Sequence, residues 1–168
     1  EALSISDRIA VMNHGVICQV AKPWEIYSAP KDAFVAGFIG ATNLIPIEVA
    51  GAREGVLIGS CGQVSLALPA QDELEPGDQI KMALRPELIQ ILYQGETVPP
   101  THWILAGRVT RVEYLGNMIK YEVSVADRVK LIVLSYNIDP SQLKKLGEEV
   151  KIHYPINRAM LFQEDQKA

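Results

Sequence analysis

The sequence has only two cysteines among its 168 residues, Cys18 and Cys61, and they do not form a C-x-x-C pair. Two thiols so far apart favour reduced side chains in a cytosolic protein, although in a small secreted domain they could pair. The chain also lacks a basic and apolar leader, and its best apolar stretch, residues 129–134, is far shorter than the ~20 residues of a membrane helix. We therefore expect no direct insertion into a membrane.

Basic charge and aromatic side chains are also scarce. The formal net charge is −4, and aromatic residues make up 7% of the chain. A protein that grips nucleic acid usually shows a basic stripe, and a single-strand binder adds stacked aromatics. The composition therefore argues against a nucleic-acid partner, while 48% hydrophobic residues are enough for a buried core.

Catalytic motifs are missing as well. The sequence has no G-x-x-x-x-G-K-[ST] phosphate loop and no G-x-S-x-G serine motif. His14 is expected in a turn, His102 in a loop and His153 in a strand, and no two of them have metal-ligand spacing. We predict that the chain by itself is not an enzyme, and we assign it no catalytic, cofactor-binding or metal-binding residue.

Residues 1–40 have the texture of a short α/β segment. Two apolar runs flank the turn residues 13–15, which predicts a hairpin over residues 8–20. Two short helices are expected to follow, one from Pro23 and one from Pro30 to Gly40, because proline suits the first position of a helix and glycine its end. The chain opens with Glu1 in a helix-like stretch, and we expect it to be a piece of a longer protein.

Beyond residue 43 the pattern is mainly β. Short apolar runs alternate with turn clusters, which is typical of a small barrel or sandwich. One helix is expected at residues 141–146, after Asp139-Pro140. The expected strands cover residues 44–49, 56–58, 64–68, 80–84, 88–92, 104–115, 118–125, 129–134, 150–154 and 159–162.

An internal repeat divides this β region. Residues 77–82, GDQIKM, match residues 147–152, GEEVKI, at an offset of 70 (147 − 77). The match predicts two similar units, at about residues 43–94 and 103–163, whose closing strands take equivalent places. Neighbouring units of this kind could also trade strands.

The segment Arg85-Pro86-Glu87 stands out between two apolar strands. Proline removes a ladder hydrogen bond, and its two neighbours carry opposite charges. Two interpretations stay open: a turn that ends a strand with a local ion pair, or a contact surface. We treat Arg85, Pro86 and Glu87 as candidate contact residues.

Residues 1–12, EALSISDRIAVM, resemble the stretch that follows the switch histidine in importer-type ABC ATPases. The same family continues with a hairpin like residues 14–20, a P-x-E-I-Y segment like residues 23–27 and an F-V-A-x-F-I-G segment like residues 34–40. Residues 41–168 resemble the appended regulatory region of that family, called TOBE, with its entry strand, its Arg-Pro-Glu motif and OB-like barrels. The resemblance thus implies two barrel units preceded by a remnant of the nucleotide-binding domain.

The resemblance implies that the chain is a regulatory and dimerisation region of an importer's ATP-binding subunit, of the polyamine, ferric iron or sugar type. The parent protein would be a cytoplasmic ATPase dimer held at the inner membrane face by permease subunits. Its ATP and Mg²⁺ sites would lie before Glu1, which leaves no cofactor in this chain. Two alternatives stay open: a small-oxyanion sensor using backbone amides near residues 60–62 or 116–117, and, less favoured, an OB-type nucleic-acid binder.

The resemblance also predicts self-association. Without the nucleotide-binding domain, residues 1–40 would be the most poorly anchored part, and several apolar side chains would lose their cover. These side chains are Trp24, Ile26, Tyr27, Phe34, Phe38 and Ile39.

Overall fold

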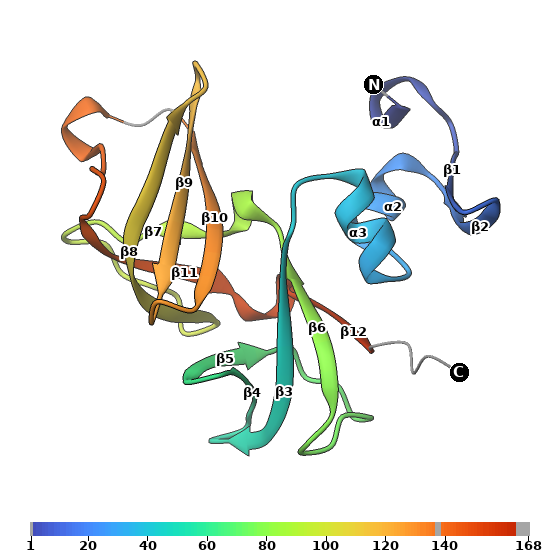
Figure 1. The fold of residues 1–168 in the computed structure, drawn as a ribbon, viewed down its shortest axis with the longest axis horizontal. Helices are drawn as coiled ribbons and strands as arrows, with labels where there is room; N and C mark the ends of the chain where they lie inside the picture. Colours follow the sequence, from blue (N-terminus) through green and yellow to red (C-terminus); the bar gives the residue numbers. More distant parts are fainter. Residues whose placement is uncertain (1, 137–138, 164–168) are drawn as a thin grey trace.

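The computed structural model describes residues 2–136 and 139–163. Glu1 and residues 164–168, the end of the region predicted to span residues 41–168, lie outside the described structure. Figure 1 shows two β-sheets joined side by side, with a small helical segment at one end. The fold is mainly β, as the sequence predicts. No helix of the described residues is long and apolar enough to cross a membrane.

The N-terminal segment forms around its own small core. Its elements are α1 (Ala2–Ile5), the hairpin of β1 (Ile9–Asn13) and β2 (Val16–Ala21), α2 (Pro23–Ser28) and α3 (Ala33–Ile39). Val11, Ile26 and Val35 are fully buried among these elements. The predicted hairpin is confirmed. The second helix begins later than Pro30 predicts, because Asp32 caps it by accepting a hydrogen bond from the Val35 amide at 2.8 Å.

Two five-stranded antiparallel sheets make up the remainder. The first has the strand order β12-β6-β3-β4-β5 and the second has the order β10-β9-β8-β11-β7. The first sheet contains β3 (Asn43–Arg53), β4 (Val56–Cys61), β5 (Val64–Leu68), β6 (Gln79–Leu84) and β12 (Met160–Gln163). The second contains β7 (Gln90–Ile91), β8 (His102–Tyr114), β9 (Met118–Val125), β10 (Val129–Tyr136) and β11 (Glu149–Pro155).

The two sheets repeat each other in detail. In the first, the Val49 amide donates to the Asp78 carbonyl oxygen at 2.9 Å; in the second, the Val109 amide donates to the Glu148 carbonyl oxygen at 2.9 Å. A bulge follows Val49 in β3 and Val109 in β8. The two acceptors, Asp78 and Glu148, are 70 positions apart (148 − 78), which is the offset of the sequence repeat.

Each half also gives its last strand to the other sheet. β7 follows the first four strands in sequence but pairs with β11, and β12 follows the second set but pairs with β6. Two short 3-10 turns, Pro86–Leu88 and Ile156–Arg158, lead into these exchanged strands. The exchange that the repeat made conceivable is therefore present.

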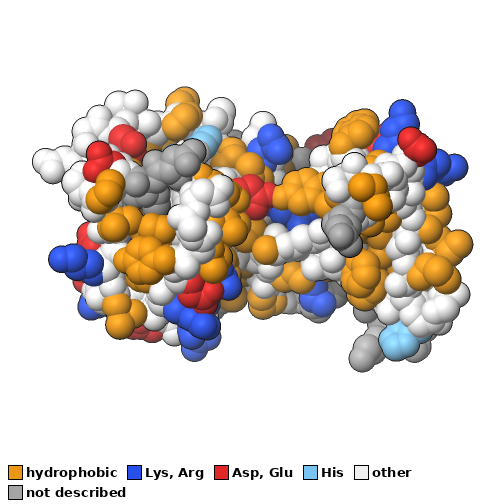
Figure 2. Space-filling model, turned by 90° about the horizontal axis from the view of Figure 1, so that it is seen from above, with side chains coloured by type: hydrophobic (Ala, Val, Ile, Leu, Met, Phe, Trp, Pro, Cys, Tyr) orange, Lys and Arg blue, Asp and Glu red, His pale blue; other side chains and the backbone are white. Residues whose placement is uncertain are grey.

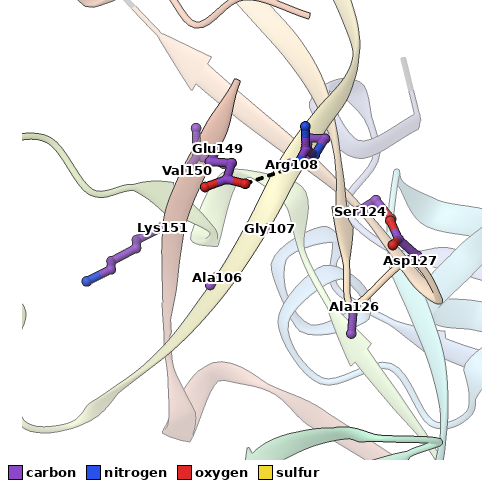
Figure 3. A pocket seen from close by; sticks show the side chains of 9 residues that line it. All are labelled: Ala106, Gly107, Arg108, Ser124, Ala126, Asp127, Glu149, Val150 and Lys151. Atoms are coloured by element: carbon purple, nitrogen blue, oxygen red, sulfur yellow. Dashed lines mark hydrogen bonds and ion pairs between the residues drawn. The ribbon is translucent and has the colours of Figure 1, made fainter. Parts of the chain in front are cut away.

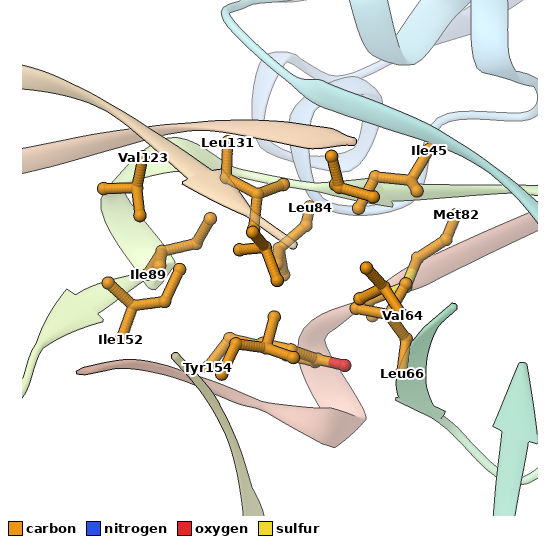
Figure 4. Packing of buried hydrophobic residues seen from close by; sticks show 14 of the residues in the cluster. Ile45, Val64, Leu66, Met82, Leu84, Ile89, Val123, Leu131, Ile152 and Tyr154 are labelled. Carbon is orange, nitrogen blue, oxygen red and sulfur yellow. The ribbon is translucent and has the colours of Figure 1, made fainter. Parts of the chain in front are cut away.

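One hydrophobic core joins the halves. Figure 4 shows side chains of both sheets meeting there, with Leu84 and Met82 of β6 on one side and Leu131 and Ile152 of the second sheet on the other. The Tyr154 hydroxyl donates to the Ala67 carbonyl oxygen at 2.8 Å, across the two sheets.

Two hydrogen bonds from a side chain of the first sheet to the backbone of the second also join the two sheets. The Asn43 side chain donates to the Ile132 carbonyl oxygen at 2.9 Å and accepts from the Ile132 amide at 2.7 Å. Side chains at the start of β3 and the end of β11 thus satisfy backbone groups on the edge strands β10 and β5. Such pairing protects strand edges that would otherwise be open.

Two local predictions are wrong. The helix expected at residues 141–146 is a single 3-10 turn, Pro140–Gln142, because Asp139 holds the Ser141 amide at 2.8 Å and the chain extends again at Leu143. The adjoining residues 137–138 lie outside the described structure. His102, expected in a loop, is the first residue of β8 and pairs with Pro155.

Candidate functional site

Arg85 lies where the N-terminal segment meets the first sheet. It follows the last residue of β6, and its side chain is only 2% exposed. The Nη1 atom donates to the Ala36 carbonyl oxygen at 2.9 Å and to the Gly40 carbonyl oxygen at 3.2 Å, and it also contacts the Thr42 hydroxyl. The Nη2 atom donates to the Tyr27 carbonyl oxygen at 3.0 Å. One side chain thereby ties β6 to both α2 and α3.

The carbonyl groups that Arg85 meets are those that a short helix leaves without partners. The last carbonyl groups of any helix have no intrahelical donor, and they form the negative end of its dipole. A buried guanidinium satisfies both needs, because it offers several N–H donors in a fixed plane and a full positive charge. Burial lowers the pKa of Arg85.

Tyr27 completes the junction from the other side. Its ring lies 4.2 Å below the Arg85 guanidinium carbon, and its hydroxyl donates to the Glu87 carboxylate. Pro86 is buried and opens the 3-10 turn that places Glu87 near Tyr27. The three candidate contact residues therefore lie together at one junction, and the surface they contact belongs to residues 27–42 of the same chain.

The structure corrects one detail of the exposure that the sequence predicts for residues 1–40. Ile26 is fully buried against Val11 and Val35, because the hairpin folds over it. Trp24 and Phe38 are each 66% exposed, as the sequence predicts. Figure 2 shows hydrophobic side chains gathered at this end of the molecule.

Apart from the Arg85 junction, the structure has a hollow on the second sheet, where β8, β9 and β11 run side by side (Figure 3). Its charged pair is Arg108 and Glu149, whose side chains form an ion pair at 3.0 Å and are largely exposed. Gly107 also lines the hollow, and a Cβ atom there would lie 2.6 Å from the Val123 side chain. The lining also includes Ser124, Asp127 and Lys151.

The two turns proposed as anion donors differ in their surroundings. At Gly62, in the turn between β4 and β5, the Arg128 side chain lies 3.0 Å from the position of an added Cβ atom. At Gly116 nothing lies within 4 Å of that position. The structure thus places a cation beside the first turn.

The structure also joins two histidines that the sequence left apart. The Nδ1 atoms of His102 and His153 lie 2.9 Å from each other, and their ring centroids are 5.1 Å apart. Sequence reasoning could have brought the two histidines together only if the β8–β11 register had been known. In that register His153 pairs with Ile104, two positions from His102. Among the described residues, no group of three or more His, Cys, Asp or Glu side chains could hold a metal ion.

Comparison with known proteins agrees with this architecture. Residues 82–162 match the family profile described as TOBE domain. The chain carries a TOBE domain. Its fold is similar to that of ModG, a cytoplasmic molybdate-binding protein, with a TM-score of 0.63 and 14% identity over 73% of this chain and 96% of that one. At that identity the likeness concerns the fold, which is OB-like.

Sequence relatives extend the match toward the N-terminus. The spermidine/putrescine import ATP-binding protein PotA of Pseudomonas fluorescens Pf-5 is 40% identical over 139 residues, which is 82% of this chain and 36% of that protein. The Fe(3+) ions import ATP-binding protein FbpC of Rhizobium etli is 37% identical over 89% of this chain and 41% of that protein. The chain therefore spans well under half the length of these relatives, which are ATP-binding subunits of ABC importers.

Proposed function

We propose that this TOBE-containing chain is the regulatory and dimerisation region of the ATP-binding subunit of an ABC importer. The subunit would couple ATP hydrolysis to solute uptake, with ATP and Mg²⁺ held by a part of the protein that this chain does not contain. Two observations support the proposal: the relatedness to importer ATP-binding proteins along most of the chain, and the TOBE domain within it. The expected location is the cytoplasmic face of the membrane, where permease subunits would hold the dimer.

The observation that carries the regulatory role is the Arg85 junction. Residues 1–40 resemble the end of a nucleotide-binding domain, and Arg85 joins them to the β region through the Tyr27 and Ala36 carbonyl groups. Buried, charge-assisted hydrogen bonds fix orientation more firmly than exposed contacts do. A movement of α2 and α3 would therefore move the first sheet with it, and the reverse would also hold.

The direct test is a chimera in which the ATP-binding part of the Pseudomonas fluorescens relative precedes this chain. We expect removal of residues 41–168 to change its ATP hydrolysis rate, and Arg85→Lys to reproduce that change with the β region still folded. A lysine ammonium is a point charge that cannot reach all the acceptors that the guanidinium fork contacts. Arg108→Lys, in an exposed ion pair, is the matched control and should leave the rate unaltered.

Two results would count against the regulatory role. One is an unchanged hydrolysis rate when residues 41–168 are removed. The other is an Arg85→Lys chimera that hydrolyses ATP like the unaltered one, although deletion has an effect.

A second candidate function, oxyanion sensing, is favoured by Arg128 beside Gly62. Arg128 lies next to the turn that begins at Gly62, directly after β4, so its guanidinium offers a positive charge and the turn offers backbone amides to an anion. Titration with molybdate, sulfate and phosphate should show saturable heat that Arg128→Gln abolishes. If none of the three anions gives saturable heat, this function is excluded.

A further inference from the structure

His102 and His153 lie on neighbouring strands and face each other on one side of the second sheet. In the β8–β11 pair, His153 stands opposite Ile104, and His102 stands opposite Pro155. The two histidines are therefore diagonal neighbours separated by two positions, which places their side chains on the same face. Their Nδ1 atoms converge to 2.9 Å, and the paired backbone holds them there.

The His153 ring is suited to the neutral form. His153 is buried, and burial lowers its pKa, with a further decrease from the neighbouring His102. The Glu96 carboxylate acts in the opposite direction and raises the pKa of His153. A neutral imidazole has a lone pair to give, and a nearby carboxylate offsets the charge of a cation.

We propose that His102 and His153 form a two-histidine site for a borderline divalent transition metal ion, such as Ni²⁺, Cu²⁺ or Zn²⁺. Imidazole nitrogen is a preferred ligand of these ions. Two cis ligands of an octahedral or square-planar ion lie about 2.9 Å apart when each bond is about 2.05 Å, and tetrahedral ligands lie about 3.3 Å apart. The observed separation fits the first arrangement directly and the second after a shift of a few tenths of an ångström.

In the metal-free state the two rings are joined by a hydrogen bond. One ring donates its Nδ1–H to the Nδ1 lone pair of the other. For both Nδ1 atoms to bind an ion, the donating ring moves its proton to Nε2, and both rings stay neutral. Water would fill the remaining positions, because the described residues bring no third ligand of the His, Cys, Asp or Glu type to the site. Binding is therefore expected to be weaker than in a closed structural zinc site.

Ni²⁺ is the probe of choice, because it does not oxidise the thiols of Cys18 and Cys61. The chain has two tryptophans, Trp24 and Trp103, and Trp103 directly follows His102. In a Trp24→Phe background, Ni²⁺ at the pair should quench the fluorescence of Trp103 in a saturable way. His102→Gln in this background should weaken binding by about tenfold or more, since one of two protein ligands is lost.

His14→Asn is the matched control. His14 lies in the exposed turn after β1 with a φ of 46°, a conformation that asparagine also accepts. This variant should bind Ni²⁺ like its parent. Equal binding by the His102→Gln variant, or no saturation below about 1 mM Ni²⁺, would overturn the proposal.

A measurement on the unaltered chain covers the case in which His102→Gln does not fold. In an NMR spectrum of the imidazole nitrogens, six-coordinate Ni²⁺ with water in its remaining positions is paramagnetic and should broaden the resonances of His102 and His153 before those of His14. Simultaneous broadening of the resonances of all three rings would mean adventitious binding only and would rule out the proposed site.

Discussion

Ile91 lies opposite Ile152 in the second sheet, in the place that Leu161 takes opposite Met82 in the first. Both pairs are related by the 70-residue offset, since 161 − 91 and 152 − 82 are both 70. Each exchanged strand pairs with a strand of the other half: β7 with β11, and β12 with β6. Neither half therefore has a complete sheet by itself, and the core between them is shared.

This exchange predicts that the halves fold only together. Produced separately, residues 41–98 lack β12 and residues 99–168 lack β7, and each leaves one side of the shared core open to water. We expect both pieces to be largely unfolded, and an equimolar mixture to form a one-to-one complex. Circular dichroism and sedimentation of each piece and of the mixture test this expectation. A native-like spectrum from either piece alone would contradict it.

The repeat could be read from the sequence because it rests on local chemistry. Gly77 and Gly147 both adopt positive φ in a turn, and the apolar alternation beyond each glycine marks a strand. Strand partners were less accessible, because register depends on residues far apart. From the sequence, the pairing of β7 with β11 could be predicted only as one possible exchange of strands between the two units.

Side-chain partners across the fold were beyond the sequence. Arg85-Pro86-Glu87 could be singled out, but not the Tyr27 ring or the Ala36 carbonyl group that meets Arg85. His102 and His153 are 51 positions apart, and only the β8–β11 register brings them together. Contacts of this kind follow from tertiary packing, which local propensity does not encode.

Gly107 is predicted to be required by packing. A Cβ atom there would lie 2.6 Å from the Val123 side chain and 2.8 Å from the Ser124 carbonyl oxygen, and a backbone oxygen cannot rotate away. We expect Gly107→Ala to lower the free energy of unfolding by about 1–3 kcal/mol through overpacking. Urea denaturation measures the change.

Gly37 supplies the control for this substitution. It lies inside α3, and an added Cβ atom would meet only Leu44 at an ordinary 3.7 Å. Gly37→Ala should leave the stability unchanged or raise it by about 0.5–1 kcal/mol, because alanine loses less backbone entropy in a helix. Equal effects at both positions would show that the close approach at Gly107 is relieved at no cost.

Glu148 is predicted to contribute to acid sensitivity. Its carboxylate accepts from the Lys144 ammonium at 2.9 Å and from the Lys145 amide at 2.9 Å, and these hydrogen bonds lower its pKa, the Lys144 bond most. The folded state therefore prefers the ionised form. This contribution to stability is present above the unfolded pKa of about 4.3 and is lost as pH falls through the lower, folded pKa.

Glu148→Gln tests this assignment through urea denaturation at a series of pH values from neutral to acidic. The variant should be less stable than the parent near neutral pH, and the difference should shrink as pH falls below about 4. Glu149→Gln is the control, because it removes the adjacent carboxylate from an exposed ion pair worth about 0–1 kcal/mol. A Glu148→Gln deficit that stays constant with pH would refute the role of the ionised carboxylate.

The final prediction separates two routes to self-association. Trp24 and Phe38 are both 66% exposed, and such apolar side chains at one end of the molecule invite non-native pairing. The proposed native dimer instead uses the β region. Deleting residues 1–40 would confuse the two, because it would strip Arg85 of its Tyr27, Ala36 and Gly40 acceptors. The double variant Trp24→Ser, Phe38→Ser keeps that junction intact. We expect it to sediment as a dimer at tens of micromolar, as the unaltered chain should. If only the unaltered chain is a dimer, association arises from the exposed helices, and the dimerisation role of the β region is wrong.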